Sequence, residues 1–210
     1  MIEAAKKYIE EIFAKDSSGH DAFHTLRVLN LAEHIAQKEG ADMETVQLAA
    51  LLHDVDDRKL SPETHLNQGN ARAFLRKQGV NQEKIDEICH IIAQISFKGS
   101  DTVAPDTLEG KCVQDADRLD AIGAIGIAHT FAFGGSRGRK MYDPAEPPVT
   151  DMDAAAYAKN TGHTINHFYE KLLLLKDMMN TSAARELAEG RHRYMEEFLS
   201  EFYAEWDGEK

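Results

Sequence analysis

Residues 48–57 read LAALLHDVDD, an apolar helical run that ends in a histidine and three aspartates. On a period of 3.6 residues, His53 lies on the same helix face as Val46 and Ala50, and Asp54 lies one turn beyond Ala50. Two polar groups on the buried side of a helix are costly unless something satisfies them. A metal ion would satisfy both groups, and so would an internal hydrogen bond.

Helical periodicity continues through most of the 210 residues, without a convincing alternating strand pattern. The sequence predicts helices at about 2–15, 20–39, 42–56, 64–79, 82–96, 107–132, 152–179 and 182–206. The chain is long enough for one substantial core, so we expect a single all-α domain over residues 1–210. One irregular stretch, residues 134–150, contains three glycines and three prolines together with Arg137, Arg139 and Lys140. Such a loop is equally typical of a functional lid and of a disordered segment.

Composition and charge exclude several classes of partner. The net charge of −12 disfavours binding to a nucleic acid polymer or to an anionic membrane surface. A small anionic ligand is compatible with this charge, because a metal ion and a few basic side chains can reverse the field inside a cleft. Cys89 and Cys112 have no C-x-x-C spacing and are expected to be buried, reduced thiols. The amphipathic N-terminus does not resemble a signal peptide and no apolar run is long enough to span a membrane, so we expect a cytoplasmic protein.

A second inward-facing histidine is His24, which lies on one helical stripe with Val28 and Leu31. The dipeptide His-Asp occurs both at residues 20–21 and at residues 53–54, and by itself carries no information. The first pair lies where a helix is predicted to begin and is explained by capping. An isolated inward histidine is more often a satisfied core residue than a ligand.

A third polar position lies in the run 115–120, DADRLD, which contains three aspartates. Asp115 shares its helix side with Arg118 and is expected to be a solvated ion-pair partner. Asp117 flanks a row that is predicted to pack against another helix and is the better candidate for a ligand; the row comprises Cys112, Ala116, Leu119, Gly123 and Gly126. Asp120, one turn further on, is a candidate contact to a substrate or to the ligands. Inward polar positions on three separate helices make a shared metal site as reasonable as a set of satisfied core residues.

The motifs HTLRV (24–28), AALLHD (49–54) and DADRLD (115–120), in this order, resemble the HD superfamily of metal-dependent phosphohydrolases. The similarity extends to SFKG (96–99) and to the FAFGG that follows the third motif, and it covers essentially the whole chain. It is closest to the small bacterial HD-domain hydrolases that act on nucleotides. The resemblance implies an all-α HD-domain bundle, with a metal-binding core at about 20–130 and additional C-terminal helices at about 152–206.

Carried over position by position, the resemblance places the metal ligands at His24, His53, Asp54 and Asp117. It places a catalytic carboxylate at Asp57, where related stringent-response hydrolases carry glutamate. We expect Asp57 to orient water or to accept its proton, with Asp54 beside it; the alternative is an exposed acid that ends the helix. The expected contacts to substrate are Lys59, Lys98, Arg118, Asp120 and His20.

The predicted activity is hydrolysis of a phosphate or pyrophosphate bond of a nucleotide by water activated by one divalent ion. Mn²⁺ is the favoured ion, while Mg²⁺, Fe²⁺, Co²⁺, Ni²⁺ and Zn²⁺ also suit this ligand set. The alternatives are a phosphodiesterase or alarmone hydrolase, and a nucleotide-sensing module that performs no catalysis. A helical interaction protein without a metal is the third possibility. The substrate, the bond that is cleaved and the oligomeric state, including a homodimer, stay open.

Overall fold

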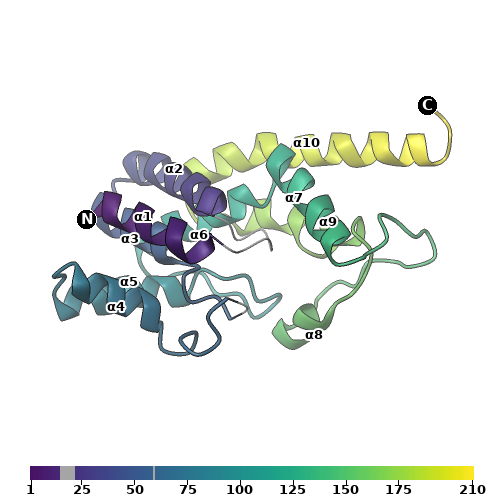
Figure 1. Cartoon of the computed structure of the whole chain (residues 1–210). Coiled ribbons are helices and arrows are strands. Elements are labelled where there is room, and N and C mark those ends of the chain that lie inside the picture. The colour runs from purple at the N-terminus through teal and green to yellow at the C-terminus, as the bar shows by residue number, and fades with distance from the viewer. Residues whose placement is uncertain (15–21, 59) are drawn as a thin grey trace. The chain divides into compact units, whose positions relative to one another are not determined.

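The computed structural model describes residues 1–14, 22–58 and 60–210, and this part of the chain is helical (Figure 1). The predicted all-α class is confirmed: no β-strand forms among the described residues, where one isolated bridge joins Lys98 and Ser100. The elements are α1 (Ile2–Phe13), α2 (Ala22–Glu39), α3 (Met43–Leu52), α4 (Gly69–Lys77), α5 (Gln82–Ala93), α6 (Leu108–Asp120), α7 (Gly123–Ser136), α8 (Ala154–Lys159), α9 (Asn166–Glu170), the 3₁₀ helix η1 (Leu172–Met178) and α10 (Ser182–Trp206).

The chain divides into two compact units, and the division falls inside α6. The first unit comprises Met1–Phe97 and Thr102–Asp117, and the second comprises Lys98–Asp101 and Arg118–Lys210.

Helix α3 lies at the centre of the first unit, where it packs against α1, α2 and α5. It begins at the N-cap Asp42, whose side chain accepts a hydrogen bond of 2.9 Å from the amide of Thr45. Such a cap satisfies one of the free amides at a helix start. Apolar residues from Val46 to Leu52 are buried on every side of α3, which explains why this short helix lacks a polar face. Helices α4 and α5 pack against each other (Figure 1).

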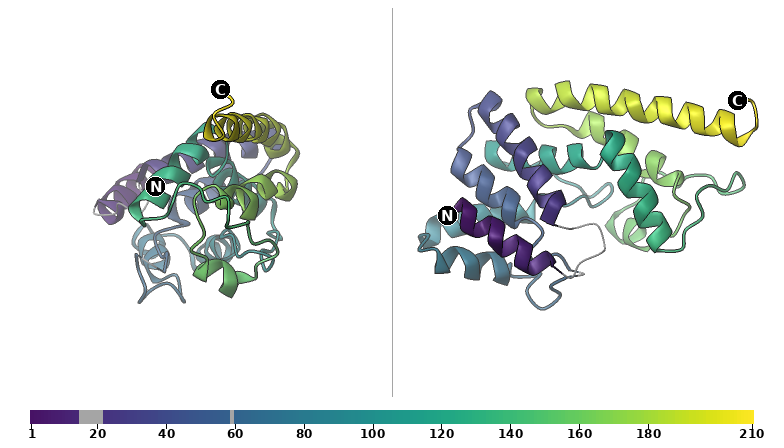
Figure 2. Two further views of the ribbon diagram at one scale, coloured as in Figure 1. Left: turned by 90° about the vertical axis from the view of Figure 1, so that its right-hand side faces the viewer. Right: turned by 45° about the horizontal axis from the view of Figure 1, so that its top comes forward.

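The second unit is organised along α10, which packs against α7 and η1 (Figure 2). Thr181 caps α10 by accepting a hydrogen bond of 3.3 Å from the amide of Ala184. Aromatic side chains fill the space inside this unit: the rings of Phe168 and Phe198 stack with their centroids 5.8 Å apart, and Phe131 meets Phe198 edge-on. The core of the second unit is therefore rich in aromatic contacts.

Several predicted helices are shorter or interrupted. Helix α3 ends at Leu52 rather than at residue 56, and α4 begins at Gly69 rather than at residue 64. The helix predicted at 107–132 is broken between α6 and α7, where Gly123 adopts φ +77°. Glycine tolerates this left-handed conformation at little cost, which allows the chain to change direction.

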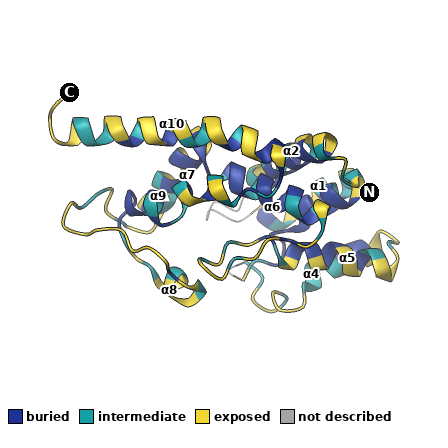
Figure 3. Ribbon diagram, turned by 180° about the vertical axis from the view of Figure 1, so that it is seen from behind, coloured by how far each residue is buried: buried dark blue, intermediate teal, exposed yellow. Residues whose placement is uncertain are grey.

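The segment predicted as one helix at 152–179 forms α8, α9 and η1 instead. The irregular stretch predicted at 134–150 begins at residue 137 and runs to residue 153. Most of that stretch is exposed or half-buried (Figure 3). Among the described residues, we find no helix long and apolar enough to cross a membrane.

Candidate metal centre

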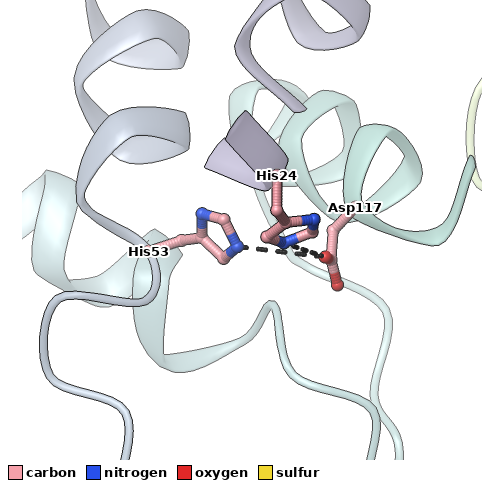
Figure 4. Close-up of side chains that lie close together, drawn as sticks. All are labelled: His24, His53 and Asp117. Carbon is pink, nitrogen blue, oxygen red and sulfur yellow. Dashed lines mark ion pairs between the residues drawn. The ribbon is translucent and has the colours of Figure 1, made fainter. Parts of the chain in front are cut away.

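Three side chains from different parts of the first unit converge (Figure 4). His24 comes from the first turn of α2, His53 follows the end of α3, and Asp117 lies near the end of α6. One ligand atom from each residue lies within 4.8 Å of the others. The distance from Asp117 Oδ1 is 3.4 Å to His24 Nε2 and 3.8 Å to His53 Nε2. Polar atoms that are 93 residues apart in the chain therefore face one small volume.

The imidazole of His53 is oriented by a hydrogen bond to its own helix. Its Nδ1 lies 2.8 Å from the carbonyl oxygen of Ala50. A carbonyl can only accept, so Nδ1 carries a proton, and in the neutral imidazole the lone pair is at Nε2. Nε2 is buried and has no hydrogen-bond partner among the described residues. This combination, one nitrogen held by a carbonyl and the other presenting a lone pair, is typical of a metal-ligating histidine.

Asp54 contributes a fourth polar group beside the two histidines. Its Oδ2 lies 3.2 Å from His53 Nε2 and 3.6 Å from His24 Nε2, and the residue is buried. Two imidazoles with two carboxylates form a donor set that suits a borderline divalent cation such as Mn²⁺, Fe²⁺, Co²⁺, Ni²⁺ or Zn²⁺. A buried nitrogen without a hydrogen bond and a fitting set of donors both agree with a metal at this position.

The electrostatics of the group describe the metal-free protein. Burial alone would lower the pKa of His53, but the charges of Asp54 and Asp117 outweigh burial and hold that pKa above its usual value. For Asp117, burial opposes ionisation, but a hydrogen bond from His24 and the charge of His53 outweigh it and lower the pKa. A divalent ion and protons therefore compete for the same atoms.

Asp56 is a structural residue that the sequence analysis missed. Its side chain is buried and accepts hydrogen bonds from the amides of Asn70, at 3.0 Å, and Ala71, at 2.9 Å, both in the first turn of α4. The side chain of Asn70 donates in return to the carbonyl of Val55, at 3.0 Å. These bonds attach the turn that carries His53 and Asp54 to the start of another helix. Only the acidic character of DVDD could have signalled this role, and it does not distinguish Asp56 from Asp57.

The expected catalytic carboxylate, Asp57, follows this turn outside any helix and is half-buried. Its amide donates a hydrogen bond of 3.0 Å to the carbonyl of Asp54. Asp57 does not share a helix side with His53, because α3 has already ended at Leu52. Its catalytic role stays a prediction.

Among the described residues, those expected to contact substrate are not members of the group His24, His53 and Asp117. His20 and Lys59 lie outside the described residues. Lys98, Arg118 and Asp120 belong to the second unit. Lys98 is exposed, whereas Arg118 and Asp120 are buried, and the guanidinium of Arg118 donates to the carbonyl of Met178. Their roles toward a substrate stay predictions.

Among the other polar residues, the prediction for Asp115 was wrong: it is fully buried rather than solvated. His90 is exposed, and its Nε2 lies 2.9 Å from Asp106 Oδ2. His163 is a satisfied core residue: its Nε2 is 3.1 Å from the carbonyl of Glu146, and its Nδ1 accepts from the amide of Asn166. Cys89 and Cys112 are buried free thiols, as predicted.

The helical fold and the His-Asp group define a class of protein: the chain belongs to the HD superfamily. The family model described as HD domain matches residues 22–122, which include all four candidate ligands. The chain is 44% identical over 199 residues to the uncharacterised protein YpgQ of Bacillus subtilis, covering 94% of this chain and 89% of YpgQ.

Solved structures agree with this assignment. A crystal structure from Lactobacillus plantarum superposes with a TM-score of 0.88 at 42% identity, covering 98% of this chain and 96% of that one. An HD-superfamily hydrolase from Bacillus thuringiensis has a TM-score of 0.78 and 44% identity, with coverage of 99% and 97%. The crystal structure of YpgQ in complex with ADP has a TM-score of 0.79 and 38% identity, with 99% of both chains covered. The chain therefore has the fold of HD-superfamily hydrolases.

Proposed function

We propose that this protein is a metal-dependent phosphohydrolase that cleaves a phosphate or pyrophosphate bond of a nucleotide. The observation that carries the proposal is the convergence of His24, His53 and Asp117, whose ligand atoms lie within 4.8 Å of one another and include the buried Nε2 atom of His53. A folded protein rarely leaves a buried ring nitrogen unsatisfied unless a ligand, an ion or a water occupies the space. Membership of the HD superfamily supports a hydrolase.

In this proposal His24, His53, Asp54 and Asp117 hold one divalent ion, with Mn²⁺ the first choice. When bound, such an ion lowers the pKa of water and draws electron density from a phosphate oxygen. The hydrogen bond from His53 Nδ1 to the Ala50 carbonyl keeps the imidazole in the tautomer that presents Nε2. The carboxylate of Asp57, which follows the ligand turn, accepts the proton of the attacking water.

The proposed substrate class is a nucleotide. The support is that YpgQ, which aligns with this chain over 99% of its length, was crystallised with ADP. The net charge of −12 argues for a small substrate, since a nucleic acid polymer would be repelled along its length.

The test is a substrate panel with protein stripped of metal and then supplied with Mn²⁺. Nucleoside triphosphates, monophosphates, cyclic nucleotides and alarmones are incubated separately, and phosphate, pyrophosphate and nucleosides are quantified. Release of phosphate or pyrophosphate that depends on added metal is the expected result. The product also distinguishes the proposed activity from the two alternative activities. A phosphodiesterase would open the cyclic nucleotides, and an alarmone hydrolase would act on alarmones alone.

One variant of a candidate ligand and one control variant sharpen this test. Asp117→Asn removes one ligand oxygen without changing size, and turnover should fall by roughly 10²-fold or more. His90→Ala removes an exposed histidine outside the group, and turnover should stay within about twofold of wild type. If no member of the panel yields a metal-dependent product, the hydrolase proposal is rejected, and tight nucleotide binding would then favour a sensor.

A further inference from the structure

Two arginines in the second unit lie beside the same aromatic ring. Phe133 is in the last turn of α7, and the Cζ atoms of Arg137 and Arg139 lie 5.4 Å and 5.8 Å from its ring centroid. The backbone sets this arrangement: the amide of Arg139 donates a hydrogen bond of 2.9 Å to the Gly134 carbonyl, and Gly138 adopts φ +65°. We call Arg137 and Arg139 the arginine pair.

The arginine pair has no carboxylate partner. Within residues 1–14, 22–58 and 60–210, neither guanidinium forms an ion pair, whereas the adjacent Lys140 pairs with Asp143 at 2.6 Å. The side chain of Arg139 donates to a neutral group, the Asn160 carbonyl, at 2.8 Å.

The nearest acid along this network is already engaged. Glu170 is buried, and its Oε1 accepts a hydrogen bond of 3.1 Å from the amide of Val149. Its Oε2 accepts one of 2.7 Å from the side chain of Asn160. This carboxylate therefore holds the backbone at Val149 and the side chain of Asn160.

Further positive groups surround a histidine on α9. The ring of His167 stacks on Tyr157 with centroids 6.4 Å apart. Burial, and after it the positive charges of Lys171, Arg139 and His129, together lower the pKa of His167 to about 3. The ring of His129 also stacks with that of Phe133, at 6.4 Å. Arg139 and Lys171 therefore both contribute positive charge close to His167.

We propose that Arg137 and Arg139 form a binding site for the phosphate chain of a di- or triphosphate. A guanidinium presents parallel N–H donors that match two oxygens of one phosphate, so two guanidiniums beside one ring can contact successive phosphates. Both arginines can donate in this way because neither is held by a carboxylate. The same chemistry fits the tail of a nucleotide and free inorganic polyphosphate. The proposal needs no metal and is independent of the proposed hydrolase activity.

The test is calorimetric titration of the full-length, metal-stripped protein with inorganic tripolyphosphate at low ionic strength. Wild type should bind saturably, and binding should weaken as salt is raised. The variant Arg137→Gln/Arg139→Gln should bind at least about tenfold more weakly, because both charge-assisted contacts are lost. Arg137→Gln alone, which removes no side-chain hydrogen bond to the fold, should weaken binding about threefold or more.

Matched controls separate a local site from a general charge effect. Lys159→Gln/Arg193→Gln removes the same charge from exposed positions of the second unit and should leave the dissociation constant within about twofold. His53→Ala should also leave it unchanged, which distinguishes this site from the candidate metal centre. An equal loss in the control pair, or no saturable binding to wild type, overturns the proposal.

A second arm identifies the source of the phosphates. A nucleoside triphosphate and the matching nucleoside without phosphate are titrated under the same conditions. Tighter binding of the triphosphate than of tripolyphosphate, lost in the double variant, identifies the tail of a nucleotide. Equal binding of the two identifies free polyphosphate chemistry, and saturable binding of the nucleoside that is unaffected by the double variant contradicts a phosphate site.

Discussion

Replacing Asp56 should weaken the protein more than replacing an exposed aspartate of the same unit. Its side chain is 5% exposed and accepts two backbone hydrogen bonds, from Asn70 at 3.0 Å and from Ala71 at 2.9 Å. Both amides lie in the first turn of α4, whose N-cap residue Gln68 makes no side-chain cap. Asp56 therefore supplies, from a distant turn, the cap that α4 lacks locally.

The magnitude follows from these two bonds. A hydrogen bond to a charged group contributes about 1.5–3 kcal/mol, and a buried donor left unsatisfied costs a similar amount. We therefore expect Asp56→Ala to lower the free energy of unfolding by about 3–5 kcal/mol. Asp56→Asn keeps one acceptor oxygen but turns an amide NH₂ toward the second backbone N–H, so its cost should be about 1.5–3 kcal/mol.

The assay is urea denaturation followed by far-ultraviolet circular dichroism, with the m-value compared to confirm that the same surface unfolds. The control is Asp86→Ala, which removes an exposed carboxylate paired with Arg72 at 2.5 Å. A surface ion pair contributes about 0–1 kcal/mol, so this variant should lose no more than that. If Asp56→Ala and Asp86→Ala lose the same free energy, the reasoning that α4 depends on a remote cap is refuted.

Three further predictions concern metal, pH and backbone. Added Mn²⁺ should raise the melting temperature of the metal-stripped wild-type protein, because an ion that binds only the folded state stabilises it. Scanning calorimetry measures this shift, and His53→Ala should abolish it. Burial raises the pKa of the Cys112 thiol to about 12, so at pH 8–9 it stays protonated, and labelling by a thiol reagent should be slow until urea is added. Gly99→Ala should destabilise the second unit by about 2 kcal/mol or more, measured by thermal unfolding, because Gly99 has φ +60° and a Cβ would lie 2.2 Å from the Met152 carbonyl oxygen.

Each of these predictions has a contrary result. An unchanged Mn²⁺-induced shift in His53→Ala would place the ion elsewhere. Rapid labelling of Cys112 in the native protein would contradict its burial. A Gly99→Ala variant as stable as wild type would mean that the loop accommodates a side chain without strain.

Local signals predicted the helices whose ends depend on neighbouring residues. The helix expected at 182–206 matches α10, because Thr181 caps its first turn and the helix continues through Gly190 to Trp206. The end of α3 depends on a distant contact, so the prediction of residue 56 was wrong. Asp56 is held by amides of α4, which lie fourteen and fifteen residues further along the chain. That contact favours a non-helical turn after Leu52 over a continuation of α3 to residue 56.

The choice among the aspartates of α6 shows a limit of periodicity. A helix wheel separates a buried face from a solvated one, and it assigned Asp115 to the solvated face. Helix α6 is instead covered on most sides, and the fully or almost fully buried residues in its middle are Cys112, Val113, Gln114, Asp115 and Ala116. Where a helix has no wide solvent face, the wheel cannot rank its polar residues.

The amino-acid sequence by itself determined the helical class, the ordered His24, His53-Asp54 and Asp117 motifs and their resemblance to one superfamily. These depend on residue type and spacing, which the chain carries without folding. Only the tertiary structure decided that ligand atoms of His24, His53 and Asp117 lie within 4.8 Å of one another, and that Asp56 attaches the ligand turn to α4. Distances between residues far apart in the chain are set by how helices pack, and no local pattern encodes them.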